Sequence, residues 1–390
     1  MKWPTKQLDE VADFRLGKML DEKKNRGDLL PYLANVNVRW GEFDFSELRE
    51  MRFEDHELDT FGLRKGDIVM CEGGEPGRCA IWKEQRPGMM IQKAIHRIRP
   101  RACLDHEFLF YTFLYMGKTG LFAPLFTGAT IKHLPREKLA LLRVPVPPQT
   151  VQKRIADTLS AYDVLIENNR RRMALLEESA RLLYQEWFVR LHFPGHEHVR
   201  VIDGVPEGWE QKSLGDIAEV VMGQSPESKY YNDVGEGLPF HQGVADFGDR
   251  FVSNRIFTSA LNRIAFPHDI LCSVRAPVGR LNITLDKIVI GRGLAALRSK
   301  SGNQSLLFYQ LKNHFFKEDL IGSGAIFASV TKAEFLKQKM LKPLESLVVA
   351  FEEVTYSIDE QLRVLYLQNQ KLLAARDLLL LRLMSGEVAV

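Results

Sequence analysis

The sequence predicts an α+β protein in which two similar globular domains are separated by two long helices that pair as an antiparallel coiled coil. Three observations predict this pseudo-twofold fold. The chain has 390 residues, which suits two or three domains. One unit occurs twice along it, and a long stretch with helical periodicity follows each copy. A composition of 45% hydrophobic and 26% charged residues excludes a wholly disordered or fibrous protein.

The internal repeat is visible as matches that follow one another in the same order. The matched pairs are Trp3 and Trp209, Asp67 and Asp269, Gly77 and Gly279, Gly128 and Gly324, and Asp163 and Asp359. Their separation falls from 206 to 196 residues and then stays at 196. The copies therefore differ by loop length in their first parts, while their C-terminal segments have equal geometry. A series of matches in one order favours duplication over chance.

The first part of each copy is rich in Gly, Pro and short apolar runs bounded by turn residues, which predicts a mixed α+β domain. The predicted boundaries are 1–146 for the first globular domain, 147–193 for the central helix, 194–342 for a linker and the second globular domain, and 343–390 for the C-terminal helix. A generic α+β domain would show the same strand pattern, so the strands alone do not indicate a function.

The second part of each copy is helical. Apolar residues recur at alternating spacings of four and three between Ile155 and Trp187, and again between Phe351 and Leu383. This 3.5-residue repeat predicts coiled-coil pairing rather than a helix lying alone on a core. Prolines stand where the helices should begin and glycines where they should end. Some 40 residues form a rod of about 60 Å.

Three polar residues fall in the apolar stripe of these helices. Asn169 and Asn369 either fix the register of the pair at some cost in stability or are tolerated surface polarity, and the sequence leaves both interpretations open. Arg376 is a departure that the sequence does not explain.

Two similar domains joined by two equal helices suit a target with approximate twofold symmetry, and duplex DNA is the natural candidate. Two recognition surfaces on one face of B-DNA lie about 34–36 Å apart, or a multiple of this distance. Partly overlapped rods of about 60 Å can span it. Because the two domains differ in sequence, the target would be bipartite and asymmetric, with a spacer that is not recognised.

Local charge supports a DNA target although the whole chain is nearly balanced at +3. Residues 270–300 contain six Arg or Lys and one Asp, and residues 68–101 contain seven Arg or Lys and three Glu. Basic side chains neutralise phosphates, and Arg is the commonest partner of guanine in the major groove. The alternative is a solvated strand face.

Several loops of small residues suit a close approach of the backbone to phosphate. They lie at 73–78, 127–130, 223–226, 273–280 and 323–325. The candidate DNA-binding residues of the first domain are Gly77, Arg78, Lys93, Thr127, Gly128, Thr130 and Lys132. Those of the second domain are Gln224, Ser225, Tyr230, Tyr231, Gln242, Ser273, Arg275, Arg280, Arg292 and Ser323.

Four motifs of the second domain resemble the target-recognition domains of type I restriction–modification specificity (S) subunits. They lie at 223–226, 237–243, 269–279 and 290–296. The first domain is more diverged, but the order of domain, helix, domain and helix extends the resemblance to the whole chain.

This resemblance implies a non-catalytic subunit that recognises a bipartite DNA site through target-recognition domains at 1–146 and 194–342. It implies two methyltransferase (M) subunits and further restriction (R) subunits as partners. No cofactor is expected on this chain, since S-adenosylmethionine, ATP and Mg would be bound by the partner subunits. The helix exteriors and the junctions around Trp187-Phe188 and Leu380-Leu381 are candidate docking surfaces, and ordinary packing between the two helices is the alternative for these residues.

No motif of a catalytic centre is present. The only Pro-Pro, at 147–148, lacks the polar and aromatic neighbours that an adenine methyltransferase needs beside a flipped base. There is no phosphate-binding GxxxxGK[ST] loop, and the histidines lack zinc spacing, although His192, His196 and His198 lie close together.

The four cysteines form no C-x-x-C pair, and the chain has neither a secretory signal nor a membrane-length apolar window. These features predict a cytoplasmic protein with no membrane partner. Two other functions stay open. A coiled-coil scaffold or adaptor would explain the helices but not two basic, glycine-rich domains, and a stand-alone DNA-binding regulator would need no methylating partner.

Overall fold

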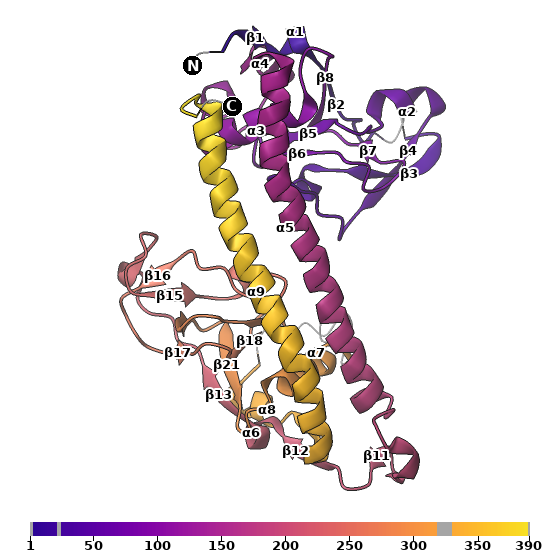
Figure 1. The fold of residues 1–390 in the computed structure, drawn as a ribbon, viewed down its shortest axis with the longest axis vertical. Helices are drawn as coiled ribbons and strands as arrows, with labels where there is room; N and C mark the ends of the chain where they lie inside the picture. Colours follow the sequence, from indigo (N-terminus) through magenta and orange to yellow (C-terminus); the bar gives the residue numbers. More distant parts are fainter. Residues whose placement is uncertain (1–2, 22–24, 318–329, 389–390) are drawn as a thin grey trace. The chain divides into compact units, whose positions relative to one another are not determined.

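The computed structural model describes residues 3–21, 25–317 and 330–388. The chain divides into two compact units, one made of Met1–Asn168 with Asn369–Val390 and the other of Asn169–Gln368. Each unit contains one α+β domain and part of each long helix, α5 (Gln149–Tyr184) and α9 (Glu345–Met384). Figure 1 shows the order of these elements along the chain.

The domain of the first unit holds a four-stranded antiparallel sheet of order β2-β8-β5-β6 and a three-stranded sheet of order β4-β3-β7, and β1 pairs with β9. Within the three-stranded sheet, β3 and β7 are parallel. The strands are β1 (Thr5–Gln7), β2 (Ala12–Leu16), β3 (Asp28–Leu33), β4 (Arg49–Phe53), β5 (Ile68–Cys71), β6 (Cys79–Ile81), β7 (Met90–Ile91), β8 (Ile95–Pro100) and β9 (Arg143–Pro145). The helices are α1 (Leu8–Val11), α2 (Asp55–Phe61), α3 (His106–Lys118) and α4 (Arg136–Ala140).

The domain of the second unit repeats this plan. Its four-stranded sheet has the order β13-β21-β18-β19, a five-stranded sheet has the order β14-β16-β15-β20-β17, and β12 pairs with β22. The strands are β12 (Glu210–Ser213), β13 (Ala218–Met222), β14 (Tyr231–Asn232), β15 (Leu238–His241), β16 (Phe257–Thr258), β17 (Ile264–Ala265), β18 (Ile270–Ser273), β19 (Leu281–Ile283), β20 (Ile288–Ile290), β21 (Leu294–Ser299) and β22 (Lys339–Lys342). The helices are α6 (Leu214–Ile217), α7 (Gln304–Lys317) and α8 (Lys332–Leu336), and a small hairpin, β10 (Val201–Ile202) with β11 (Val205–Pro206), precedes them. The common order of the four-stranded sheets confirms the predicted repeat.

The central strand of each four-stranded sheet explains how the two sheets and the helix pack. All four residues of β5 are buried, and so are all four of β18. Successive side chains of a strand point to opposite faces. Ile68 and Met70 accordingly join the core beneath α3, whereas Val69 and Cys71 join the core shared with the second sheet. A short, wholly apolar run is therefore the sequence signature of a strand covered on both faces.

Helices α5 and α9 pair, as the 3.5-residue repeat predicts, and Figure 1 shows them side by side. Asp163 binds Arg376, whereas Ile166, further along α5, contacts the earlier Asn369 of α9. The residue numbers rise on one helix as they fall on the other, so the pairing is antiparallel. Within the second unit, the rings of Tyr184 at the end of α5 and Phe351 near the start of α9 lie 6.2 Å apart, as an antiparallel pairing requires.

The first long helix ends earlier than the expected residue 193. Its α-helical part stops at Tyr184, and a π-helical turn, Gln185–Val189, follows. This turn places Phe188 in the second unit's core, where its ring lies 5.9 Å from that of Trp209. Aromatic packing thus accounts for the departure from regular α-helical geometry.

The structure also explains two polar residues of the stripe. Asn369 is only 6% exposed, and its Nδ2 donates to the Ile166 carbonyl oxygen at 3.4 Å. This burial favours the pairing role of Asn369 over tolerated surface polarity. Arg376 donates to Asp163 at 2.6 Å, and Asp163 also accepts from the Tyr111 hydroxyl at 2.6 Å. Arg376 is therefore one partner of an ion pair between the helices.

Candidate nucleic-acid interface

The first unit brings two of the predicted loops together beside the four-stranded sheet. Residues 72–78 connect β5 to β6, and residues 127–134 follow α3. The Leu134 amide donates to the Glu72 carbonyl oxygen at 2.8 Å. A Cβ added at Gly73 would lie 3.2 Å from His133, so the loops are in close contact. Gly77 has a φ of +88°, and a Cβ there would meet the Phe122 ring at 2.9 Å, which is why glycine is required.

The loop 127–133 is a closed, solvent-exposed hairpin. Thr127 and His133 exchange two backbone hydrogen bonds of 2.8 Å. Between them, the candidates Thr127, Gly128, Thr130 and Lys132 are all exposed. Ile131, at 66% exposed, was not singled out from the sequence. Its position as an apolar residue within a loop rich in Gly and Thr was the signal from which its exposure could have been predicted.

Arg78 and Lys93 are less accessible than the sequence predicts. The Arg78 guanidinium donates to the Asn35 carbonyl oxygen at 2.9 Å and to Glu75 at 3.0 Å, and its side chain is 15% exposed. Lys93 is half-buried, and its backbone amide donates to the Lys18 carbonyl oxygen. Arg78 therefore stabilises the loop 72–78 by bonding to Glu75 within the loop and to Asn35 outside it.

In the second unit the hairpin 273–280 connects β18 to β19. Ser273 is 1% exposed; its hydroxyl donates to the Pro277 carbonyl oxygen at 2.5 Å and accepts from the Arg280 amide at 2.9 Å. Ser273 is therefore an internal support of the hairpin. Arg275 and Arg280 are exposed. Gly279 repeats the role of Gly77, since a Cβ there would lie 2.8 Å from the Phe315 ring.

A second group of candidates gathers around Gly291 and Gly293, which lie between β20 and β21. The Ser225 hydroxyl donates to Gln242 Oε1 at 2.8 Å and accepts from the Arg292 amide at 3.2 Å. The Gln224 amide donates to the Ile290 carbonyl oxygen at 2.9 Å. Gln224, Gln242 and Arg292 expose their side chains around this junction. The structure thus brings together four candidates from three segments that are far apart in sequence.

The adjacent tyrosines differ in exposure. The Tyr231 hydroxyl donates to the Pro226 carbonyl oxygen at 2.9 Å, and its ring lies 4.7 Å from that of Phe240, so Tyr231 supports the loop 223–226. Tyr230 is 40% exposed. Ser323 lies outside the described residues.

The two loop surfaces are equivalent at the level of the backbone. The Glu72 amide donates to the Ala94 carbonyl oxygen at 2.8 Å, and the Val274 amide donates to that of Gly293 at 2.9 Å. Val330 bonds to Val274 as Leu134 bonds to Glu72. The same backbone frame therefore carries different side chains in the two units.

Several basic residues that the sequence counts toward DNA binding have structural partners. Arg99 bonds to Asp67 through two hydrogen bonds of 2.6 and 2.7 Å, and Arg298 bonds to Asp269 in the same way at 2.8 and 2.9 Å. The bound carboxylate raises the pKa of each guanidinium. Arg97 donates to backbone carbonyl oxygens, including that of Thr60 at 2.7 Å. The local charge counts thus overestimate the available positive charge.

Three arginine candidates of the second unit are exposed and available for contact with DNA. Arg275, Arg280 and Arg292 make no ion pair and no side-chain hydrogen bond with any other residue that the structure describes. Such side chains are free to contact phosphate oxygens or base edges.

Residues 3–21, 25–317 and 330–388 contain no group of three or more His, Cys, Asp or Glu side chains that could hold a metal ion. Burial raises the pKa of the Cys79 and Cys272 thiols. Among the helices of the described chain, none combines the length and apolarity that crossing a bilayer requires.

The fold and these surfaces define a class of protein: an internally duplicated α+β protein with paired helices and one loop surface for each copy. The chain belongs to the type I restriction modification DNA specificity family, whose model matches residues 1–178 and 206–345. It is the specificity subunit of a type I restriction–modification system, which determines recognition of the DNA target and is itself non-catalytic.

Individual relatives extend over nearly the whole chain. A Methanocaldococcus jannaschii protein assigned as the specificity subunit of the type I restriction enzyme MjaX is 26% identical over 401 residues, covering 100% of this chain and 94% of that protein. The HindI specificity subunit of Haemophilus influenzae is 21% identical over 400 residues, covering 84% and 87%. The crystal structure of an S subunit from M. genitalium has the same fold, with a TM-score of 0.54, 18% identity and coverage of 98% and 96%.

Proposed function

We propose that each unit's loop surface binds one half of an asymmetric bipartite DNA site, with target-recognition domains at 1–146 and 194–342. The observation that carries this proposal is the common backbone frame with different exposed side chains. The second surface presents Arg275, Arg280 and Arg292, whereas the first presents Ile131 and Lys132. Equal geometry suits equivalent positions along a duplex, and unequal side chains suit different base sequences.

The paired helices then set the spacer and dock two methyltransferase subunits. Their outward faces carry a series of exposed apolar residues, which is unusual for a helix without a partner. These residues are Val164, Leu165, Leu175 and Leu182 on α5, and Val349, Val354, Tyr356, Val364, Leu367, Leu378 and Leu381 on α9. Phe188 and Leu380, expected at the docking junctions, are buried in the cores instead.

The catalytic chemistry belongs to the partners in this proposal. The methyltransferase subunits bind S-adenosylmethionine, and restriction subunits that join the complex bind ATP and Mg. The complex acts in the cytoplasm, where its DNA substrate is found.

A selection experiment tests the assignment. The chain in complex with its methyltransferase subunits is incubated with random duplexes, and the methylated sequences are determined. We expect two different half-sites separated by a spacer of fixed length and no fixed sequence, with binding that weakens steeply as salt rises. Methylation without sequence preference, or a chain that forms no complex with a methyltransferase, would contradict the proposal.

Matched variants assign the two halves. R275A should relax recognition of the second half-site only, and K132A combined with I131A should relax the first only. Each variant serves as the control for the other because all three residues are exposed and their truncation leaves the cores intact. Loss of both half-sites in either variant would count against separate surfaces.

A further inference from the structure

We infer that Arg250 is a positioning residue that fixes the DNA-binding hairpin 273–280 relative to the paired helices, and so sets the spacer that the second recognition domain tolerates. This inference rests on the proposed function, because it concerns how the second half-site is placed. Every contact that carries it lies within the second unit.

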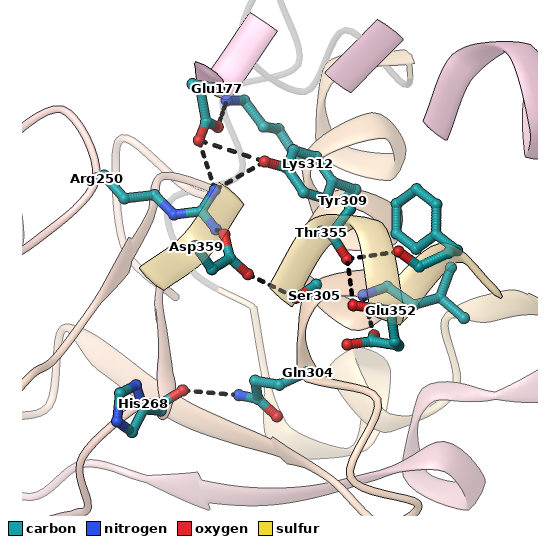
Figure 2. A network of polar contacts seen from close by, with 12 residues as sticks. Glu177, Arg250, His268, Gln304, Ser305, Tyr309, Lys312, Glu352, Thr355 and Asp359 are labelled. Carbon is teal, nitrogen blue, oxygen red and sulfur yellow. Dashed lines mark hydrogen bonds and ion pairs between the residues drawn. The ribbon is translucent and has the colours of Figure 1, made fainter. Parts of the chain in front are cut away.

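The Arg250 side chain connects its domain to both long helices at once. It is 3% exposed, and its guanidinium donates to Glu177 of α5 at 2.6 Å and to Asp359 of α9 at 2.5 Å. Figure 2 shows the guanidinium between these two carboxylates. A planar guanidinium can bridge two carboxylates in one fixed geometry, which a point charge cannot do.

Helix α7 completes the enclosure around Arg250. The Phe308 ring centroid lies 3.9 Å from the guanidinium carbon, and the Tyr309 hydroxyl accepts from the guanidinium at 3.2 Å. Lys312 donates to the same Glu177 at 2.6 Å. Two cations thus neutralise Glu177, and the aromatic rings of Phe308 and Tyr309 pack against the Arg250 guanidinium.

The start of α7 is also bound to α9. The Ser305 hydroxyl donates to Asp359 at 2.5 Å, and the Leu306 amide donates to Glu352 at 2.8 Å. Carboxylates at a helix N-terminus satisfy free amides and interact favourably with the helix dipole. Figure 2 shows this row of contacts continuing from Asp359 to Glu352.

The backbone next to Arg250 is bonded to the strand that leaves the DNA-binding hairpin. The Ile283 amide donates to the Arg250 carbonyl oxygen at 2.9 Å, and Asn282 Nδ2 donates to the Gly248 carbonyl oxygen at 2.7 Å. Strand β19 begins at Leu281, directly after Arg280. A shift of Arg250 relative to the helices would therefore move the hairpin that carries Arg275 and Arg280.

The first unit is built differently at the corresponding place. Asp163 is the repeat counterpart of Asp359, and the Tyr111 hydroxyl donates directly to it, whereas the Tyr309 hydroxyl accepts from Arg250. The cation on Asp163 is Arg376, which comes from α9 itself. Arg250 is thus a feature of the second domain, and its removal should affect that half-site alone.

Two variants test the role in the complete complex with the methyltransferase subunits. R250M keeps much of the side-chain volume but leaves Asp359 without its cation and Glu177 with Lys312 alone. The triple variant E177Q/R250M/D359N removes the unpaired charges as well, so it stays informative if R250M fails to fold. The control is R363M, which removes an exposed ion pair with Glu360 from the same helix.

The readout is spacer selectivity, the methylation rate on the preferred spacer divided by the rate on spacers one base pair longer or shorter. We expect the triple variant to fold but to lose selectivity by about fivefold to tenfold, as for coupling between linked sites, with the base preference of the first half-site unchanged. R363M should match the unmodified complex. A folded triple variant with unchanged spacer selectivity would overturn the inference.

The same experiment separates this inference from the proposed function. If the unmodified complex methylates all spacers equally, the bipartite function itself fails. If the unmodified complex discriminates spacers and the triple variant discriminates them equally well, only the role of Arg250 fails.

Discussion

Ser273, Arg78 and His96 have side chains directed toward the backbone of loops whose exposed residues are the DNA-binding candidates. Ser273 bonds within its hairpin, Arg78 bonds to the Asn35 carbonyl oxygen, and His96 Nε2 lies 2.9 Å from the Leu134 carbonyl oxygen. A loop that is already ordered loses less conformational entropy on binding. Under the proposed function, these side chains contribute to recognition by fixing the loops rather than by touching DNA.

His96 makes stability depend on pH in a predictable direction. It is fully buried, and desolvation lowers the pKa of its imidazole. The neutral ring donates its Nε2 proton to Leu134. As pH falls below about 6.5, the His96 imidazole takes up a proton in the unfolded chain but not in the native chain. Stability present above this pH is then lost, by at most about 1.4 kcal/mol per pH unit for this group.

The variant H96Q tests this assignment, since glutamine can donate to Leu134 but does not titrate. Urea unfolding at pH 7.5 and pH 5.5 should show a smaller loss for H96Q than for the unmodified chain. His241, another buried histidine with a lowered pKa, should account for part of what remains. An unchanged pH dependence in H96Q would exclude His96 as a contributor.

At the scale of elements, the helices were predictable from sequence and the sheets only in outline. The 3.5-residue repeat specifies which helix face is buried, because that periodicity is local. Strands such as β7 and β20 have two or three residues, too few for a pattern of their own. Their pairing with β3 and β15 joins residues 58 and 49 positions apart. The existence of the repeat was more informative than any single strand.

The same limit applies to the candidate site. The sequence does not distinguish the exposed Arg275 and Arg292 from Arg78, whose guanidinium is bonded within the fold. The partner of Arg78 is the Asn35 carbonyl oxygen, which lies 43 residues away in the chain. Asp67 and Asp269 show that a partner can recur in both copies, and their repeat could have marked Arg99 and Arg298 as structural. Comparing the copies residue by residue is therefore the useful signal.

The ion pair between the long helices gives a test at this scale. Arg376 is 14% exposed and Asp163 21%. R376M should lower the free energy of unfolding by about 1–3 kcal/mol, because it leaves a largely buried carboxylate without its cation. D163N combined with R376M should recover part of this loss. Urea unfolding measures both.

An exposed pair provides the comparison. R363M removes the ion pair with Glu360, in which the Arg363 side chain is 36% exposed and the Glu360 side chain 39%. This substitution should lower the free energy of unfolding by no more than about 1 kcal/mol. Equal losses in R376M and R363M would show that the inter-helix pair has no special role.

At the scale of the whole molecule, duplication and asymmetry serve different purposes. Under the proposed function, two copies of one frame give two surfaces of the same geometry, and separate loop sequences let each surface recognise different bases. The links between domain and helices differ as well: Arg250 bonds to Asp359 of α9 in the second unit, whereas Tyr111 bonds to Asp163 of α5 in the first. A change in one recognition loop can then alter one half-site without altering the spacer.

If the helices set the spacer, lengthening both should change it in phase with the DNA helix. The insertion points are after Asn168 in α5 and after Gln368 in α9, close to the contact between Ile166 and Asn369. One heptad in each helix adds about 10 Å, or about three base pairs, and turns the second half-site by roughly a third of a turn. Three heptads add about 31 Å, close to the 34–36 Å of one DNA turn.

We expect methylation to fall on every spacer when one heptad is inserted in each helix. Methylation should return when three heptads are inserted in each helix, on a spacer longer by about nine or ten base pairs. Methylation rates on duplexes with spacers lengthened by up to about twelve base pairs measure this, and selection of unchanged half-sites controls for damage to the domains. If both insertions keep the original spacer preference, the helices do not determine the distance between the half-sites.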